Sequence, residues 1–275
     1  MSKSRIKRII ILLLAFADLT LLGNLIYHRY SAAHIPKTTL DSTVAYLQRC
    51  GIWIEESTLP GRSPSLSTML LAEDERAETA VAEALLGDDH RTDQGGGIAA
   101  YESDRGTVTF RRGGLISASL NQIPTPADAS AAQKQAEELL RTCRILPDSY
   151  GIVVETGGNG MTVRFIQRIG DYPLQNAGLE VTFRDGAAQI SGCAFLNEVR
   201  GGSERMQQIP ALLAEFGAYV VESGSEISLI ASVEPVYFHT VASDGGAELL
   251  PALLVRTDRG DFVLNGVDAT LLAGT

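Results

Sequence analysis

The sequence contains few of the residues from which enzymes build active sites. Its 275 residues include only four histidines and three cysteines, and the cysteines follow no metal-binding or redox spacing. It contains no G-x-S-x-G, H-E-x-x-H or P-loop sequence. One S-x-x-K sequence, at residues 4–7, lies in the N-terminal tail with no domain around it. These absences exclude the common signatures of hydrolases, metalloproteases and nucleotide-binding enzymes, so we expect no enzymatic activity and no cofactor.

The few chemically versatile side chains fit structural positions. The odd number of cysteines allows one disulfide and a free thiol, or three free thiols, and the patterns around Cys143 and Cys193 predict core positions. His239 lies in an expected strand, where a hydrogen-bonded structural position is more common than a catalytic one. Residues 88–93 gather three aspartates and His90, but this spacing matches no known cation-binding loop, so we expect a solvated loop and no metal site.

Two further patterns allow a functional and a structural interpretation. Trp53, between Ile52 and Ile54, could form an exposed docking patch or part of a buried strand edge, and we expect the buried edge. The glycine-rich stretches at residues 95–97 and 157–160 could suggest phosphate-binding loops. Neither follows a strand and opens a helix in the required order, so we expect both to be turns.

A single long apolar run occupies residues 9–27, and its nineteen residues would span roughly 28 Å as a helix, close to the thickness of a bilayer core. Four basic residues precede it, which predicts a cytoplasmic N-terminus and an extracytoplasmic remainder. A signal peptide cleaved near residues 31–33 is the alternative. Because the run is too long for a typical signal peptide, we predict an uncleaved, single-pass anchor in the cell membrane.

Asp18 lies at the midpoint of this run, where a carboxylate costs about 2.5–3.5 kcal/mol on insertion scales. The many Leu and Ile residues could absorb this cost, or Asp18 could enter the membrane protonated. Alternatively, Asp18 meets a polar partner on another membrane helix, and the small and polar stripe of Ala17, Thr20 and Asn24 supports such packing. These four residues are therefore the candidate partner-binding residues within the membrane.

The charge balance excludes one class of partner. Residues 31–275 keep 18 of the 23 Lys and Arg and 32 of the 33 Asp and Glu, which leaves a net charge of −14. Such a surface repels phosphate backbones, so we expect no nucleic-acid binding.

Beyond residue 30, helical periodicity alternates with short strands. Helices are expected at about residues 40–49, 73–87, 128–146 and 205–224, and antiparallel meanders with glycine-rich turns follow the last three. Asp128 is the expected N-cap of the third of these helices. We therefore predict an α+β fold with a tail and transmembrane helix at residues 1–30. Three units that each lay a helix on an antiparallel sheet follow it, at 31–122 (with a leading helix), 123–202 and 203–275.

Two segments carry a family resemblance. One is FIQRIGDYPLQNAGLEVTF at residues 165–183, and the other is the C-terminal LLPALLVRTDRGDFVLNGVDATLL. Together with the basic tail and the single apolar segment, they resemble the YycH/YycI regulatory proteins, whose closing strands also occur in PepSY-type modules. The residues that match are Phe165, Gln167, Pro173, Asn176, Pro251 and Asn265. In this family they are structural motif positions.

The resemblance implies a membrane-anchored extracytoplasmic protein of Gram-positive bacteria that modulates a cell-wall-sensing two-component histidine kinase. Its partners would be that membrane sensor kinase and a paralogous anchored regulator, with the transmembrane helix contributing to the contact. Since PepSY-like modules are part of the resemblance, an inhibitor or chaperone of a secreted peptidase is the alternative function.

Overall fold

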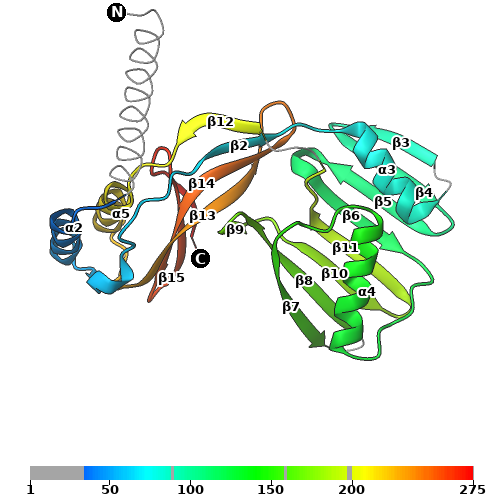
Figure 1. Ribbon diagram of the computed structural model, residues 1–275, viewed down its shortest axis with the longest axis horizontal. Coiled ribbons are helices and arrows are strands. Elements are labelled where there is room, and N and C mark those ends of the chain that lie inside the picture. Colours follow the sequence, from blue (N-terminus) through cyan, green and yellow to red (C-terminus); the bar gives the residue numbers. More distant parts are fainter. Residues whose placement is uncertain (1–33, 88–89, 158–159, 197–199, 275) are drawn as a thin grey trace, which may run out of the picture. The chain divides into compact units, whose positions relative to one another are not determined.

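The computed structural model describes residues 34–87, 90–157, 160–196 and 200–274 (Figure 1). In these residues strands predominate, with sixteen strands and four α-helices. The helices are α2 (Lys37–Arg49), α3 (Glu75–Leu86), α4 (Ala129–Thr142) and α5 (Ile209–Ser223). The strands are β1 (Trp53–Ile54), β2 (Ser67–Leu71), β3 (His90–Gly95), β4 (Ile98–Ser103), β5 (Gly106–Arg111), β6 (Leu115–Leu120), β7 (Tyr150–Gly157), β8 (Gly160–Ile169), β9 (Tyr172–Gln175), β10 (Leu179–Arg184), β11 (Ala187–Cys193), β12 (Arg200–Arg205), β13 (Leu229–Val241), β14 (Ala247–Thr257), β15 (Gly260–Asn265) and β16 (Leu271–Gly274).

The α+β fold of helix-plus-antiparallel-meander units, predicted from the sequence, is wrong. The protein is mostly β, and its strands join a large mixed sheet in which β13 pairs in parallel with both β1 and β9. Alternation along a strand sets which of its faces is buried but does not select its neighbour. Parallel pairing between distant segments therefore left no pattern in the sequence.

No helix in the described ranges is both long enough and apolar enough to cross a membrane. The predicted transmembrane helix at residues 9–27, with Ala17, Asp18, Thr20 and Asn24, lies outside the described residues. The structure thus gives no support to that helix.

Contacts divide the chain into two compact units. Unit 1 takes the N-terminal part up to residue 65, together with residues 208–233 and 255–260. Unit 2 takes residues 66–207, 234–254 and 261–275. Strands β13 and β14 contribute residues to both units.

Unit 2 contains an antiparallel sheet of strands in the order β3-β4-β5-β6-β11-β10-β8-β7. A helix leads each half of it, α3 before β3–β6 and α4 before β7–β11, and the closing strands β6 and β11 pair with each other in the middle (Figure 1). Both helices pack against the sheet, α3 on β4 and β5 and α4 on β7 and β8. The largest fully buried side chains between these layers are Tyr101, Phe165, Phe183, Leu86, Leu140, Leu179 and Ile190.

Local sequence explains these elements well. Asp128 caps α4 by accepting a hydrogen bond from Ala131 N at 2.8 Å, which confirms the predicted N-cap. Asp74 caps α3 in the same way. Along β6, Ile116, Ala118 and Leu120 are buried while the alternate residues are exposed, as a strand with one covered face requires.

In unit 1, α2 and α5 pack against each other. Gly217 lies at the contact, because a Cβ there would lie 3.0 Å from Tyr46 Cε1 and 3.2 Å from Leu47 Cδ2. The missing side chain therefore lets the two helices approach closely. Helix α5 is the more apolar of the two, with Leu212, Leu213 and Phe216 fully buried.

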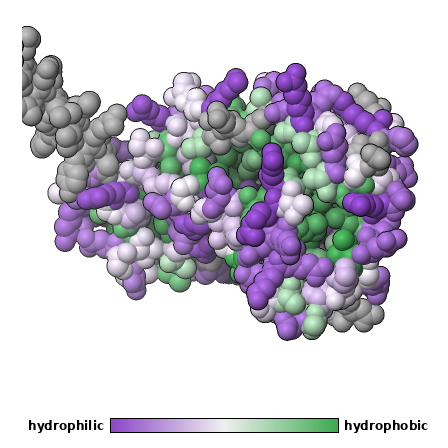
Figure 2. All heavy atoms as spheres, turned by 45° about the vertical axis from the view of Figure 1, so that its right-hand side comes forward, coloured by the Kyte–Doolittle hydropathy of each residue, from purple (hydrophilic) through white to green (hydrophobic). Residues whose placement is uncertain are grey.

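The face of the molecule drawn in Figure 2 is mostly hydrophilic. Figure 2 shows hydrophilic side chains over most of the face drawn, with hydrophobic ones exposed in patches between them. Among the described residues, the large hydrophobic side chains with the highest exposure are Trp53 and Val221, each 60% exposed.

Candidate functional site

The family-motif residues lie at structural positions. Phe165 is fully buried in the core of unit 2, and Gln167 Nε2 donates a 2.7 Å hydrogen bond to the carbonyl oxygen of Cys193. Asn176 has a positive φ of 59°, a conformation that Asn tolerates, and Pro173 lies in the short strand β9. These side chains pack or turn the chain.

The two C-terminal motif residues also shape the backbone. The carbonyl oxygen of Pro251 accepts a hydrogen bond from Gly266 N at 2.7 Å, and Asn265 Oδ1 accepts one from Val267 N at 2.9 Å. Both bonds order the turn between β15 and β16.

The structure brings together one pair with the elements of nucleophilic chemistry, Cys193 and His239. The Cys193 Sγ lies 3.8 Å from His239 Nδ1, within reach of a sulfur hydrogen bond. On its other side, His239 Nε2 lies 2.7 Å from the carbonyl oxygen of Gly113, so this nitrogen carries the proton and donates it. Nδ1 is then the acceptor, and the thiol donates to it. This confirms the hydrogen-bonded position expected for His239, whereas its contact with Cys193 was not foreseen.

Burial holds both members of the pair neutral. Cys193 is 1% exposed and His239 is 4% exposed. Burial raises the pKa of the Cys193 thiol to about 12, and burial also lowers the pKa of His239 despite the bond to Gly113. A cysteine nucleophile works as a thiolate, generally beside a protonated histidine. The pair has the opposite protonation states and acts as a structural hydrogen bond.

A small cavity in unit 2 has chain neighbours of Cys193 in its lining. Gly114, Ala194 and Phe195 are among its lining residues, Cys193 and His239 are not, and its volume is about 30 Å³. This is room for about one water molecule, whereas ligand pockets measure roughly 300–1,000 Å³. All three cysteines are free thiols.

The predicted aspartate-rich loop is described only in part. Asp88 and Asp89 lie outside the described residues, and His90 begins β3. Within the described ranges, no group of three or more His, Cys, Asp or Glu side chains is arranged to hold a metal ion.

Trp53 is the most exposed large aromatic feature of unit 1, and the prediction of a buried strand edge is wrong for it. Its neighbours Ile52 and Ile54 are 0% and 2% exposed, whereas Trp53 is 60% exposed. Strand β1 pairs in parallel with β13 so that Trp53 lies beside Leu229 and Ile54 beside Ile230. Ile54 and Ile230 face the core, while Trp53 and Leu229, itself 39% exposed, face outward side by side. We call Trp53 and Leu229 the Trp53 patch.

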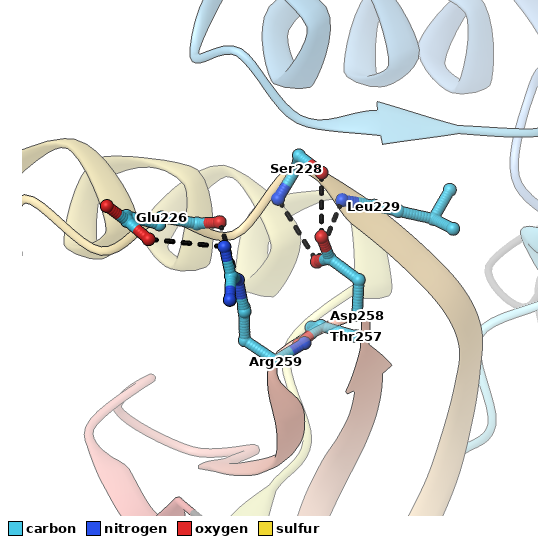
Figure 3. A network of polar contacts seen from close by, with 6 residues as sticks. All are labelled: Glu226, Ser228, Leu229, Thr257, Asp258 and Arg259. Atoms are coloured by element: carbon cyan, nitrogen blue, oxygen red, sulfur yellow. Dashed lines mark hydrogen bonds and ion pairs between the residues drawn. The ribbon is translucent and has the colours of Figure 1, made fainter.

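A cluster of hydrogen bonds around Asp258, which we call the Asp258 clamp, holds the backbone of the patch (Figure 3). One carboxylate oxygen accepts hydrogen bonds from the backbone nitrogens of Ser228 and Leu229, each at 3.1 Å, and the other accepts one from Ser228 Oγ at 2.7 Å. The carbonyl oxygen of Ser228 in turn accepts the Trp53 N–H at 2.7 Å. Asp258 therefore fixes the backbone of both patch residues, while the Leu229 side chain points away from the network (Figure 3).

The electrostatics of the clamp favour a charged Asp258. The hydrogen bond from the Ser228 hydroxyl, followed by bonds from the backbone nitrogens of Leu229 and Ser228, lowers the pKa of Asp258 below its ordinary value. Beside it, Arg259 Nη2 forms a 3.1 Å ion pair with Glu226 and Arg259 Nε donates to the carbonyl oxygen of the same residue (Figure 3). Exposed aromatic side chains surrounded by polar groups are typical of protein-binding surfaces.

Comparisons with known proteins assign no family. No family model matches the chain, and no curated protein matches it in sequence. Two solved structures share part of its layout. One is an uncharacterised protein from Eubacterium rectale ATCC 33656, with 8% identity and a TM-score of 0.47, covering 77% of this chain and 87% of that chain. The other is the C-terminal domain of YpeB from Bacillus megaterium, with 10% identity and a TM-score of 0.37, covering 74% of this chain and 97% of that chain.

At these levels of identity and TM-score the overlap in layout is partial. The resemblance to YycH/YycI proteins and to PepSY-type modules therefore stays a prediction.

Proposed function

We propose that this chain is a non-enzymatic regulator that acts outside the cytoplasm by binding another protein through the Trp53 patch. The observation that supports the proposal is the outward position of Trp53, 60% exposed beside Leu229 on a backbone fixed by Asp258. Tryptophan is the residue type most enriched in binding hot spots, and a pre-ordered backbone lowers the entropic cost of binding.

The proposed partner is the extracytoplasmic part of a cell-wall-sensing histidine kinase. Binding would shift the signalling equilibrium of the kinase only if the patch has a higher affinity for one of its two states. A change of kinase output therefore requires a difference in affinity between these two states.

The size of the expected effect follows from the exposed area. A tryptophan offers up to about 250 Å² of surface, so 60% exposure leaves roughly 150 Å² for a partner to cover. At about 25 cal/mol per Å² this area is worth at most 3–4 kcal/mol. Truncation of a central hot-spot residue costs about 2 kcal/mol or more, which is about a 30-fold loss of affinity.

The test is a binding measurement with the purified sensor region of the kinase, by calorimetry or surface immobilisation. Trp53→Ala is expected to lower the affinity at least about 30-fold. Val221→Ala is the matched control, because Val221 lies in the same unit and is also 60% exposed. Equal affinities of the Trp53→Ala and wild-type chains would rule out the Trp53 patch as the binding surface. Binding of a secreted peptidase in place of the kinase would favour the inhibitor function.

A further inference from the structure

The antiparallel sheet of unit 2 ends at β7, which within the described residues pairs only with β8. Arg168 N donates to the carbonyl oxygen of Ser149 at 3.0 Å, and these two residues lie opposite each other in the β7–β8 register. Since hydrogen-bonded pairs alternate along an antiparallel ladder, the odd-numbered residues of β7 bond to β8. The N–H and C=O groups of Tyr150, Ile152, Val154 and Thr156 therefore point outward from the sheet edge.

This edge lacks the features that protect other sheet edges in unit 2. At the opposite end of the same sheet, the β3–β4 register shifts between Asp93 and Gly95, and the pairing of β12 with β2 is irregular between Gly201 and Arg205. Such irregularities keep a strand from pairing with a foreign one. The β7–β8 register is unbroken over all eight residues, and β7 contains neither proline nor lysine. An edge of this kind is suited to accept another strand.

We propose that β7 pairs antiparallel with β7 of a second copy of this chain, around a two-fold axis at Val153. In this register Ile152 lies opposite Val154 of the second copy, and Tyr150 lies opposite Thr156 of the second copy. Each of these pairs exchanges two backbone hydrogen bonds, about eight in total across the symmetric interface. The half-buried side chains of Ile152 and Val154 pack against the core of unit 2, and the second copy extends this layer.

The outer face of the edge is compatible with the same register. Val153, 40% exposed, meets Val153 of the second copy, and Ile166, 41% exposed, lies on the same face of the adjacent strand, opposite Gly151. Glu155 lies opposite Gly151 of the second copy, which leaves room for its side chain. Within one chain Arg164 forms ion pairs with both Glu155, at 3.3 Å, and Glu180, at 3.2 Å.

Repulsion between the two copies of Glu155 is weak in this arrangement. The two residues are four positions apart along the paired strands, or about 14 Å at about 3.4 Å per residue. This separation exceeds the Debye length of about 8 Å at physiological ionic strength, so solvent ions screen the pair.

Disulfide trapping in the full-length chain tests both the pairing and its register. In a chain with Cys50→Ala, Val153→Cys places two thiols at a non-hydrogen-bonded pair, where the Cα atoms lie about 4.5 Å apart and a disulfide can form. Glu155→Cys is the matched control, since it is also exposed but lies beyond the about 7 Å limit from its own copy. We expect oxidation to give a covalent dimer of Val153→Cys at least about tenfold faster than of Glu155→Cys.

Two further variants sharpen the result. A mixture of Gly151→Cys and Glu155→Cys chains is expected to form a mixed disulfide, because these residues lie opposite each other. Adding Val154→Pro to the Val153→Cys chain is expected to abolish the dimer, because it removes an outward N–H and leaves the ladder to β8 intact. Monomeric Val153→Cys after oxidation, or equal trapping at positions 153 and 155, would overturn the proposal.

Discussion

The neutral state of the Cys193–His239 pair predicts a slow reaction of Cys193 with alkylating reagents. At pH 8 a thiol with a pKa of about 12 is ionised in about one molecule in 10⁴, whereas an ordinary thiol with a pKa of about 8.5 is ionised to roughly a quarter. The ratio of thiolate populations is about 2,000. The more basic thiolate of Cys193 is about 40-fold more nucleophilic, which offsets part of this difference. The expected alkylation rate of Cys193 is then still about 50-fold lower than that of an ordinary thiol, and its 1% exposure lowers the rate further.

The assay is alkylation of the folded chain with iodoacetamide at pH 8, followed over time by peptide mass spectrometry. Cys50 is only partly buried and should be labelled first, while Cys143, whose pKa burial raises to about 11, should be slow as well. In urea, where the chain is unfolded, all three cysteines should react at similar rates. This control shows that slow labelling of Cys193 comes from the folded structure and not from poor detection of its peptide. If His239 activated Cys193 as a nucleophile, Cys193 would be labelled fastest in the folded chain, and that result would refute the structural interpretation.

Three further predictions concern stability. Burial, with the charges of Glu73 and Asp74, raises the pKa of Glu78 from 4.5 to about 6, so its contribution to stability is present below pH 4.5 and lost as the pH rises to about 6. That shift corresponds to about 2 kcal/mol, reduced by solvent screening of a half-exposed carboxyl to at most about 1 kcal/mol. Glu78→Gln should therefore raise the free energy of unfolding by up to that amount at pH 7 and not at pH 4, and an equal gain at both pH values would contradict this.

Phe165→Ala should lower the free energy of unfolding in urea by about 3–5 kcal/mol, and Ile166→Ala by less than about 1 kcal/mol, because these neighbours on β8 are 0% and 41% exposed. Similar losses for the two variants would contradict the buried position of Phe165. Asp258→Asn should lower the thermal midpoint at pH 7, and because the pKa of Asp258 is depressed, the difference from wild type should shrink as the pH falls below the ordinary value of 3.8. If the difference in thermal midpoint did not depend on pH, the charged carboxylate of Asp258 would not be what stabilises this backbone.

Short-range features of the fold could be predicted from the sequence because neighbouring residues determine them. The N-cap at Asp128 and the apolar stripe of α4, with Ala132, Ala136 and Leu140 fully buried, followed from local spacing. The buried face of α3 is harder to assign from the sequence, since Ala82 and Leu86 are buried while Ala84 is exposed. A short helix rich in alanine gives a weak signal for its orientation.

Long-range pairing could not be predicted. The pairing of β6 with β11 joins two meanders that each look complete in the sequence. The parallel pairs of β13, with β1 and β9, join segments far apart in the chain and leave no local pattern. The contact of Cys193 with His239 also depends on these pairings.

For the Trp53 patch the sequence did contain a signal. In the segment Ile52–Trp53–Ile54, two-residue alternation turns the tryptophan outward when both isoleucines face the core. The interpretation as a buried edge gave more weight to the apolar character of Trp53 than to this alternation. The partner strand that presents Leu229 beside it was beyond the reach of sequence patterns.

The central claim is that the chain acts by binding at the Trp53 patch and not by chemistry at Cys193. The most direct measurement compares Trp53→Ala and Cys193→Ala chains in cells that lack the native protein, with phosphorylation of the response regulator paired with the kinase as the readout. The account predicts that Trp53→Ala behaves like the deletion while Cys193→Ala restores regulation. Loss of regulation with Cys193→Ala, together with normal regulation by Trp53→Ala at equal protein levels, would contradict it.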